Sequence, residues 1–320
     1  MSTTIRLRLF ALAALLLALC ACNGSKTEPF TIVMLPDTQF YSERLPGYFH
    51  DQTGWVVDHA AGENIVFVTH VGDIVQSGDG RPQEWDVAHA AMSRLDGVVP
   101  WAVAIGNHDY DRSEPRGRAA KFLEFFGPSR FRGQDWFGGA SPNGLNSYQF
   151  FEGGGIRFLI LHIESDFPDE AMAWAASILA EHEGVPTIVS THIYLLDSTS
   201  ARTAEPYYRP DIGNSGEEIW QKFIRKNPQI FMVLCGHWSG AGGEWKQVSK
   251  NDAGEDVIEV LADFQSRDNG GDGWLRIIRF EPAENRIRFR TYSPSLDEYE
   301  VDENSEFEFP VDFKSRFGPE

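Results

Sequence analysis

Five apolar stretches of this chain each end in side chains that can offer an oxygen or nitrogen atom to a metal ion. The endings are, in chain order, PDTQ (36–39), GD (72–73), GNHD (106–109), TH (191–192) and GHWS (236–239). Carboxylate, amide and imidazole groups gathered in one place form a mixed oxygen and nitrogen metal site. The pattern therefore predicts metal chemistry, with candidate ligands at Asp37, Asp73, Asn107, His192 and His237.

The segments before these endings have the length and composition of buried strands. In α/β sheets the loops beyond the carboxyl ends of the strands form the binding crevice, so five such ends can meet. Glycine before a ligand lets the backbone turn sharply, as Gly72, Gly106 and Gly236 would.

Helices are expected between several of the strands. A helix after Pro82 would bury Trp85, Ala88, Met92 and Leu95 on one face, and a second would run over 169–183. A third begins at Ser215, where Glu218 completes a capping box. Residues 274–280 and 286–292 alternate as a C-terminal hairpin does.

No stretch rich in Pro, Gly or Ser divides the chain, so we expect one layered α/β domain over residues 30–320. Two long segments lack periodicity, 127–146 and 197–214, and loops of that length are often functional. The acidic stretch 297–308 is expected to be solvated surface.

Charge narrows the class of substrate. The 320 residues carry a net charge of −19, which repels nucleic acid, so no nucleic-acid partner is expected. A small phosphorylated substrate would need cations supplied locally, and bound metal would supply them.

The N-terminus has the features of an export signal. Arg6 and Arg8 precede an apolar run over 9–19 that is short for a membrane span. The run ends in LCAC, which resembles a bacterial lipoprotein signal box, so residues 1–22 would be the signal, with Cys22 as the lipidated first mature residue and 23–29 as a tether. The protein would then be exported and anchored in the bacterial cell envelope by lipid alone. A plain secretory signal is the alternative.

One further cysteine exists, Cys235, so a disulfide framework is excluded. It lies inside an apolar run and is expected to be a small buried hydrophobe.

The ordered set of strand endings resembles the calcineurin-like metallophosphoesterase family. Its signature runs D-x-H, GD-x, GNH[DE], a lone His and GHxH, and nearly the whole mature chain takes part in the likeness. PDTQ and NGGDGWLR are similar to a bacterial lipoprotein-type branch. The resemblance implies a four-layer α/β/β/α sandwich with the metals between the sheet ends.

The resemblance also implies roles for single residues. Asp73 would bridge two divalent ions, and Asn107, His192 and His237 would complete the site of one of them. Two ions would activate a hydroxide that cleaves a phosphomonoester or phosphodiester. His108 would protonate the leaving oxygen, and Asp109 would orient and polarise that imidazole.

This chain departs from the family pattern at the other ion, the one that Asp37 would hold. Gln39 and Ser239 stand where the signature has histidines. Gln39 offers an amide oxygen, whereas Ser239 would contact the metal weakly or through water. Losing two imidazoles favours Mn²⁺ as the expected ion, with Mg²⁺ or Ca²⁺ next and Zn²⁺ or Fe less suited.

The substrate pocket is less determined. Tyr110, Tyr194 and Trp238 are the candidate substrate-binding residues, and Arg202 or Arg209 would reach a phosphate. The alternative function is a non-catalytic surface lipoprotein that keeps a structural metal and binds an envelope ligand. The intact GNHD favours the hydrolase, and no G-x-S-x-G elbow supports a serine hydrolase.

Overall fold

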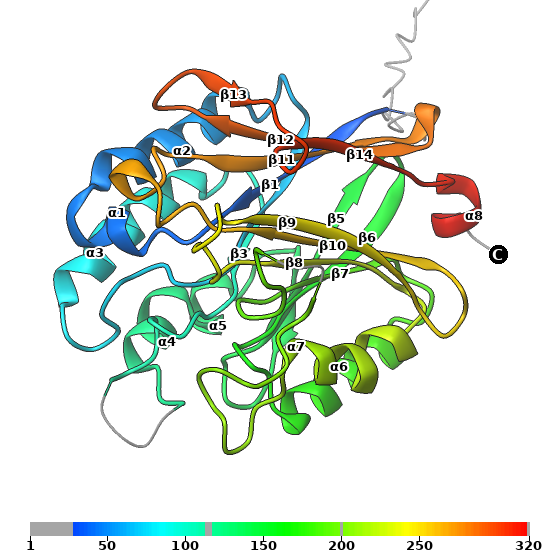
Figure 1. Ribbon diagram of the computed structural model, residues 1–320, viewed down its shortest axis with the longest axis horizontal. Coiled ribbons are helices and arrows are strands. Elements are labelled where there is room, and N and C mark those ends of the chain that lie inside the picture. Colours follow the sequence, from blue (N-terminus) through cyan, green and yellow to red (C-terminus); the bar gives the residue numbers. More distant parts are fainter. Residues whose placement is uncertain (1–27, 113–116, 199–200, 319–320) are drawn as a thin grey trace, which may run out of the picture.

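The computed structural model describes residues 28–112, 117–198 and 201–318. The predicted signal peptide and Cys22 lie outside the described residues. Two seven-stranded sheets pack against each other, and helices cover their outer faces (Figure 1). Among the described helices, none has both the length and the apolar character needed to cross a bilayer.

The first sheet has the order β13-β12-β11-β1-β2-β3, and β14 also pairs with β12. Its parallel strands are β1 (Phe30–Leu35), β2 (Ile65–His70) and β3 (Trp101–Val103). The predicted hairpin is confirmed as β11 (Leu275–Glu281) and β12 (Arg286–Ser293), which pair antiparallel.

The second sheet has the order β4-β5-β6-β7-β8-β10-β9. Four parallel strands form its centre: β6 (Ile156–His162), β7 (Thr187–Ser190), β8 (Ile230–Cys235) and β10 (Asp256–Ala262). Antiparallel strands flank them: β4 (Phe137–Ala140), β5 (Ser147–Gly153) and β9 (Glu244–Lys250).

Helices cover the outer face of each sheet (Figure 1). Against the first lie α1 (Gln39–Arg44), α2 (Pro46–His59) and α3 (Pro82–Met92), with α4 (Ala120–Phe126) and α5 (Pro128–Phe131) beside them. Against the second lie α6 (Asp169–Glu181) and α7 (Gly216–Lys222), while α8 (Phe313–Phe317) ends the described chain. The predicted capping box of Ser215 and Glu218 is present.

Both faces of the central strands are buried, which explains their unbroken apolar sequences. In β1, Ile32 and Met34 enter the core between the two sheets, and Val33 and Leu35 enter the core under the helices. The two sheets are thus fixed face to face, and their strand ends are brought to a common edge.

The acidic stretch 297–308 is not simply solvated surface, as the sequence had suggested. It supplies β13 (Glu298–Glu300) and the start of β14 (Glu306–Pro310), and both strands pair with β12. Ser305 is fully buried there, and Phe307 packs against the core. Aromatic residues alternating with the acidic ones allow one face of β14 to be covered.

His70 and His162 are packed within strands. The His162 ring joins the two sheets, because Nε2 lies 2.9 Å from Thr69 Oγ1 and Nδ1 lies 2.7 Å from Gln149 Oε1. Burial lowers the pKa of each imidazole to about 3. Both rings are therefore neutral structural groups at neutral pH.

Candidate metal centre

Strand ends from both sheets bring the predicted ligands together. Asp37, Asp73 and Asn107 follow β1, β2 and β3 of the first sheet. His192 and His237 follow β7 and β8 of the second sheet. The five side chains belong to loops that are distant in sequence, and only the face-to-face packing of the sheets makes them neighbours.

The His192 imidazole lies at the centre of this group. Its Nε2 is 3.1 Å from Asp73 Oδ2, 3.1 Å from Asn107 Oδ1 and 3.2 Å from His237 Nδ1. Ligand atoms that each sit about 2 Å from one ion must lie about 3 Å from one another. Each of the three neighbours thus lies at a ligand-like distance from His192 Nε2. One ligand atom each of Asp73, His192 and His237 lies within 4.8 Å of the other two, which is close enough to share an ion.

A second contact fixes the orientation of His192. Its Nδ1 lies 3.0 Å from the carbonyl oxygen of Val71 and donates a proton to it. The lone pair is then left on Nε2, which is the atom that faces the other ligands. Metal-bound histidines generally have such a partner for their second ring nitrogen.

The backbone is adapted to the site at close range. Asp73 and His237 have positive φ angles of 52° and 73°, which non-glycine residues rarely adopt. A Cβ on Gly106 would lie 2.1 Å from Asp73 N, and one on Gly236 would lie 2.4 Å from Asp37 Oδ1. Glycine is required at both positions because the ligand residues pack directly against them.

The protein's own groups leave an excess of negative charge in the site. Burial and two nearby carboxylates, Asp263 and Asp73, raise the pKa of Asp37 well above its usual range. Burial also opposes the ionisation of Asp73, but His192 beside it outweighs burial and lowers the pKa of Asp73. Burial lowers the pKa of His192, but the neighbouring carboxylates, Asp73 foremost, raise it by more, so the net shift is upward. Buried carboxylates with these neighbours are stabilised by added positive charge.

Two buried oxygens support the fit to metal. Asp37 Oδ1 and Gln39 Oε1 make no hydrogen bond, although their residues are 2% and 4% exposed. Buried polar atoms are rarely left without a partner, since the loss of hydration is costly. A divalent ion at the predicted second position would give Asp37 Oδ1 a partner, and the Gln39 oxygen has no competing protein partner among the described residues, so these donors fit a metal there.

The structure corrects the role of Asp109. Its Oδ1 accepts hydrogen bonds from the backbone N–H groups of Ile74 (2.8 Å) and Val75 (3.1 Å), and its Oδ2 accepts one from Gly106 (2.8 Å). The predicted pairing with His108 is therefore wrong. His108 Nδ1 instead lies 2.9 Å from the Gln76 carbonyl oxygen, while the His108 backbone N–H donates to Asp73 Oδ1 at 2.8 Å. Asp109 joins the loops after β2 and β3.

Two of the predicted substrate-binding residues are core residues. Tyr110 is 1% exposed, and its hydroxyl donates to Glu164. Tyr194 is fully buried, and its hydroxyl donates to Glu259 Oε2 at 2.8 Å. Neither ring is available to a substrate, so this prediction was wrong for both.

The two arginines that the sequence suggested for phosphate binding instead contact glutamate side chains. Arg202 contacts both carboxylate oxygens of Glu259 at 2.7 Å, and Arg209 Nη1 contacts Glu164 Oε2 at 2.9 Å. Arg112 is a cation close to His108 that sequence reasoning missed. Exposed Arg112 donates from Nη2 to the Gln76 carbonyl oxygen at 2.7 Å, and this is the oxygen that His108 Nδ1 contacts.

Aromatic rings border the site at His237. The Tyr207 ring lies 4.6 Å from His237 and 5.7 Å from Trp238, measured between centroids. Tyr207 is 55% exposed, which leaves much of its surface accessible. Trp238 is thus beside the site as expected, and its contact with substrate stays a prediction.

Around the second ion, the structure adds two residues that sequence reasoning missed, Asp263 and Gln265. The Gln265 amide donates to Asp37 Oδ2 at 3.1 Å and to Asp263 Oδ2 at 2.8 Å. Ser239, by contrast, has its hydroxyl 2.6 Å from Ser266 Oγ. The sequence ADFQ (262–265) after an apolar run was the available signal, since it repeats the pattern of the other five endings.

Comparisons with known proteins agree with this geometry. Residues 30–239 match the family model described as calcineurin-like phosphoesterase. An uncharacterized protein of Bacillus subtilis (strain 168), YvnB, is 33% identical over 300 residues, which are 90% of this chain. This chain spans 22% of the length of that relative.

Solved structures show the same fold at low identity. A purple acid phosphatase, PPD1 from yellow lupin (Lupinus luteus), has a TM-score of 0.56 at 15% identity, covering 91% of this chain and 55% of its own. A dimetal phosphatase from Danio rerio has a TM-score of 0.52 at 12% identity, covering 89% and 100%. GAP50, described as the anchor in the inner membrane complex of Plasmodium, has a TM-score of 0.52 at 12% identity, covering 89% and 90%.

Proposed function

This chain belongs to the calcineurin-like phosphoesterase family, and from that premise we propose that it is a metal-dependent phosphoric ester hydrolase. The observation that carries the proposal is the convergence of donor atoms from Asp73, Asn107 and His237 at 3.1 to 3.2 Å from His192 Nε2, a spacing that ligands of one ion can have. The family implies a dinuclear site for divalent ions. Two such ions would lower the pKa of a water between them and offset the charge of phosphoryl oxygens.

Residues of the chain itself would perform the other roles in the reaction. Asp73 would contribute to both positions, since its Oδ2 lies 3.1 Å from His192 Nε2 and its charge also acts on Asp37. His108, which is held by Asp73 through its backbone and by Gln76 through Nδ1, has Nε2 left to give a proton to the departing oxygen. General acid catalysis of this kind contributes about 10²- to 10⁴-fold to a rate.

Arg112 is the side chain that we assign to the substrate phosphate. It is exposed and shares a carbonyl acceptor with His108, so its guanidinium lies beside the proposed acid. A guanidinium can hold two phosphoryl oxygens at once. Arg112→Ala is expected to raise KM about tenfold with a smaller change in kcat, in keeping with the loss of one charge-assisted contact. Steady-state kinetics measures the two separately, and an unchanged KM would remove Arg112 from the site.

Hydrolysis of two chromogenic aryl phosphates, one a monoester and one a diester, tests the function itself. Turnover is expected with added Mn²⁺ and not with chelator. The ratio of the two rates would identify the preferred ester class. Absence of turnover for both esters in protein shown to contain metal would instead favour the alternative, a metal-containing binding lipoprotein.

A further inference from the structure

The end of β10 adds a sixth potential ligand to the five strand ends described above. β10 runs parallel to β8, and Leu261 pairs with Cys235 in their register. Two residues further along each strand stand Asp263 and His237. Because parallel neighbours end at the same edge of a sheet, Asp263 reaches the metal centre as His237 does.

The carboxyl group of Asp263 lies next to that of Asp37. Both residues are buried, at 0% and 2% exposure, and the Gln265 amide donates to one oxygen of each. Within the described part of the chain, no lysine or arginine forms an ion pair with either carboxyl. Two buried carboxyl groups so placed can both be ionised only when a cation lies between or beside them.

We propose that Asp263 is a ligand of the second divalent ion, the one that Asp37 and Gln39 would hold, and that Gln265 orients it. The inference rests on the proposed function, since it requires the dinuclear site. Asp263 would supply the ligand that Ser239 does not, because the Ser239 hydroxyl pairs with Ser266. The second site would then consist of oxygen donors alone, namely Asp37, Gln39, Asp73 and Asp263. Such a site prefers Mn²⁺ or Mg²⁺ to Zn²⁺.

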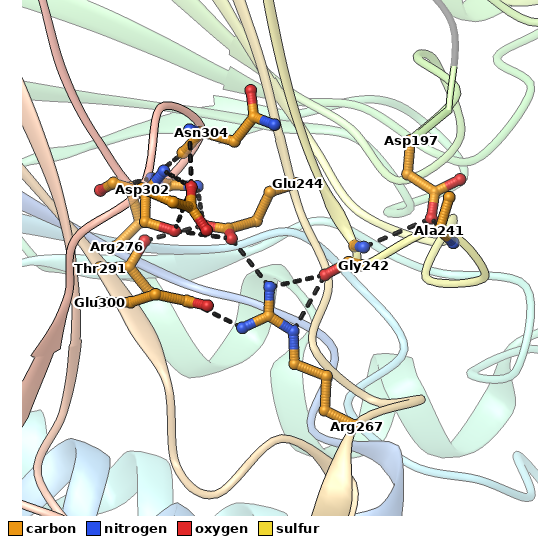
Figure 2. A network of polar contacts seen from close by, with 12 residues as sticks. Asp197, Ala241, Gly242, Glu244, Arg267, Arg276, Thr291, Glu300, Asp302 and Asn304 are labelled. Carbon is orange, nitrogen blue, oxygen red and sulfur yellow. Dashed lines mark hydrogen bonds and ion pairs between the residues drawn. The ribbon is translucent and has the colours of Figure 1, made fainter.

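The loop that carries Asp263 is held firmly in place. The Asp263 backbone N–H donates to Gly243 O at 2.7 Å, and a Cβ on Gly243 would lie 1.6 Å from the Asp263 carbonyl oxygen. Figure 2 shows how Arg267 fixes the other end of the loop, contacting Gly242 O, Glu244 Oε2 (2.8 Å) and Glu300 Oε2 (2.6 Å). A rigid loop holds the carboxyl in position before an ion binds.

The acidic groups in Figure 2 do not form a competing cation site. Glu244, Glu300 and Asp302 lie close enough to share an ion. Arg267 pairs with Glu244 and Glu300, and the buried Arg276 has Nη2 2.7 Å from Glu244 Oε1, while Asp302 accepts hydrogen bonds from the Asn304 and Ser305 backbone N–H groups. The contrast with Asp263 and Asp37, where no such arginine is present among the described residues, identifies which acidic cluster requires metal.

The test is metal binding by the full-length chain, measured without substrate. Wild-type protein titrated with Mn²⁺ is expected to bind two ions per chain by elemental analysis, and to show a spin-coupled pair by electron paramagnetic resonance. Asp263→Asn keeps the shape and removes the charge. This variant is expected to bind the second ion at least about tenfold more weakly and to show the spectrum of isolated Mn²⁺. Asp263→His is expected to restore tight binding and to shift the preference toward Zn²⁺.

A matched control is Glu259→Gln, because Glu259 is also a buried acid, within β10, but has both carboxylate oxygens contacted by Arg202 and one by the Tyr194 hydroxyl. It should retain both ions, and circular dichroism should show that each variant is folded. Two coupled ions of unchanged affinity in Asp263→Asn would overturn the proposal, as would a single ion in wild-type protein. If wild-type protein binds two ions and Asp263→Asn loses one, but no phosphate ester is hydrolysed, the assignment of Asp263 stands and the proposed function fails.

Discussion

The Asp73→Ala variant is expected to hydrolyse aryl phosphates no faster than chelator-treated wild-type protein and to retain neither divalent ion after dialysis. Asp73 is fully buried between the two proposed metal positions, with Oδ2 3.1 Å from His192 Nε2 and Oδ1 bonded to the His108 backbone. Removing it deletes the one carboxylate that both ions would share and also releases the loop that carries the proposed acid. The effects on metal content and on turnover should therefore appear together.

Loss of folding is not the expected cause. Asp73 is one of the charges that raise the pKa of Asp37, so its removal relieves repulsion within the buried carboxylate cluster. Thermal unfolding followed by circular dichroism in chelator should show the variant still folded, although losing the Asp73 contacts with His192 and the His108 backbone lowers its stability. Asp86→Ala, which removes an exposed aspartate of α3, is the control and should keep both metal and activity. Retained turnover in Asp73→Ala would contradict the dinuclear mechanism.

The His108→Ala variant is expected to lose about 10²- to 10⁴-fold in kcat for an alkyl phosphate while its metal content is unchanged. His108 contacts Asp73 only through its backbone N–H group, and alanine preserves that contact. The imidazole is bound by Gln76 at Nδ1, so truncation removes the proton donor without disturbing a ligand.

The leaving group distinguishes a general acid from a residue that merely shapes the site. A nitrophenolate leaves without needing a proton, whereas an alkoxide needs one. The loss in kcat should therefore be small for a nitrophenyl phosphate and large for an alkyl phosphate. His59→Ala on the exposed side of α2 is the control, and equal losses for both substrates would contradict the assignment.

Much of the centre could be predicted from the sequence because each ligand is tied to a local signal. Asp73, Asn107, His192 and His237 each come at the end of an apolar run, and three of the four directly follow a glycine. Such runs form strands that are buried on both faces, and parallel strands end at one edge, so ligand residues at their ends meet. The structure brings these four side chains together, and their binding of a metal ion stays a prediction. Export and lipidation at Cys22 stay predictions, since that segment lies outside the described residues.

Only the tertiary structure decided which polar neighbours of these ligands face the metal. Asp109 follows His108 directly, yet its carboxylate turns to backbone N–H groups of Ile74, Val75 and Gly106. Tyr110 and Tyr194 point into the core because Glu164 and Glu259 offer buried acceptors there. Successive side chains of an extended segment point to opposite sides, so one step along the chain separates a ligand from a core residue.

Asp263 is a residue that the sequence analysis did not select but that the tertiary structure places beside Asp37. Its strand, β10, was not predicted, because no glycine or histidine marks its end, and its place beside β8 arises from pairing between Val233 and Glu259 and their neighbours. The sequence by itself determined that Gln39 and Ser239 replace two imidazoles. The tertiary structure decided that a carboxylate from another strand lies beside Asp37, because only the packed sheets bring that strand end to the same edge.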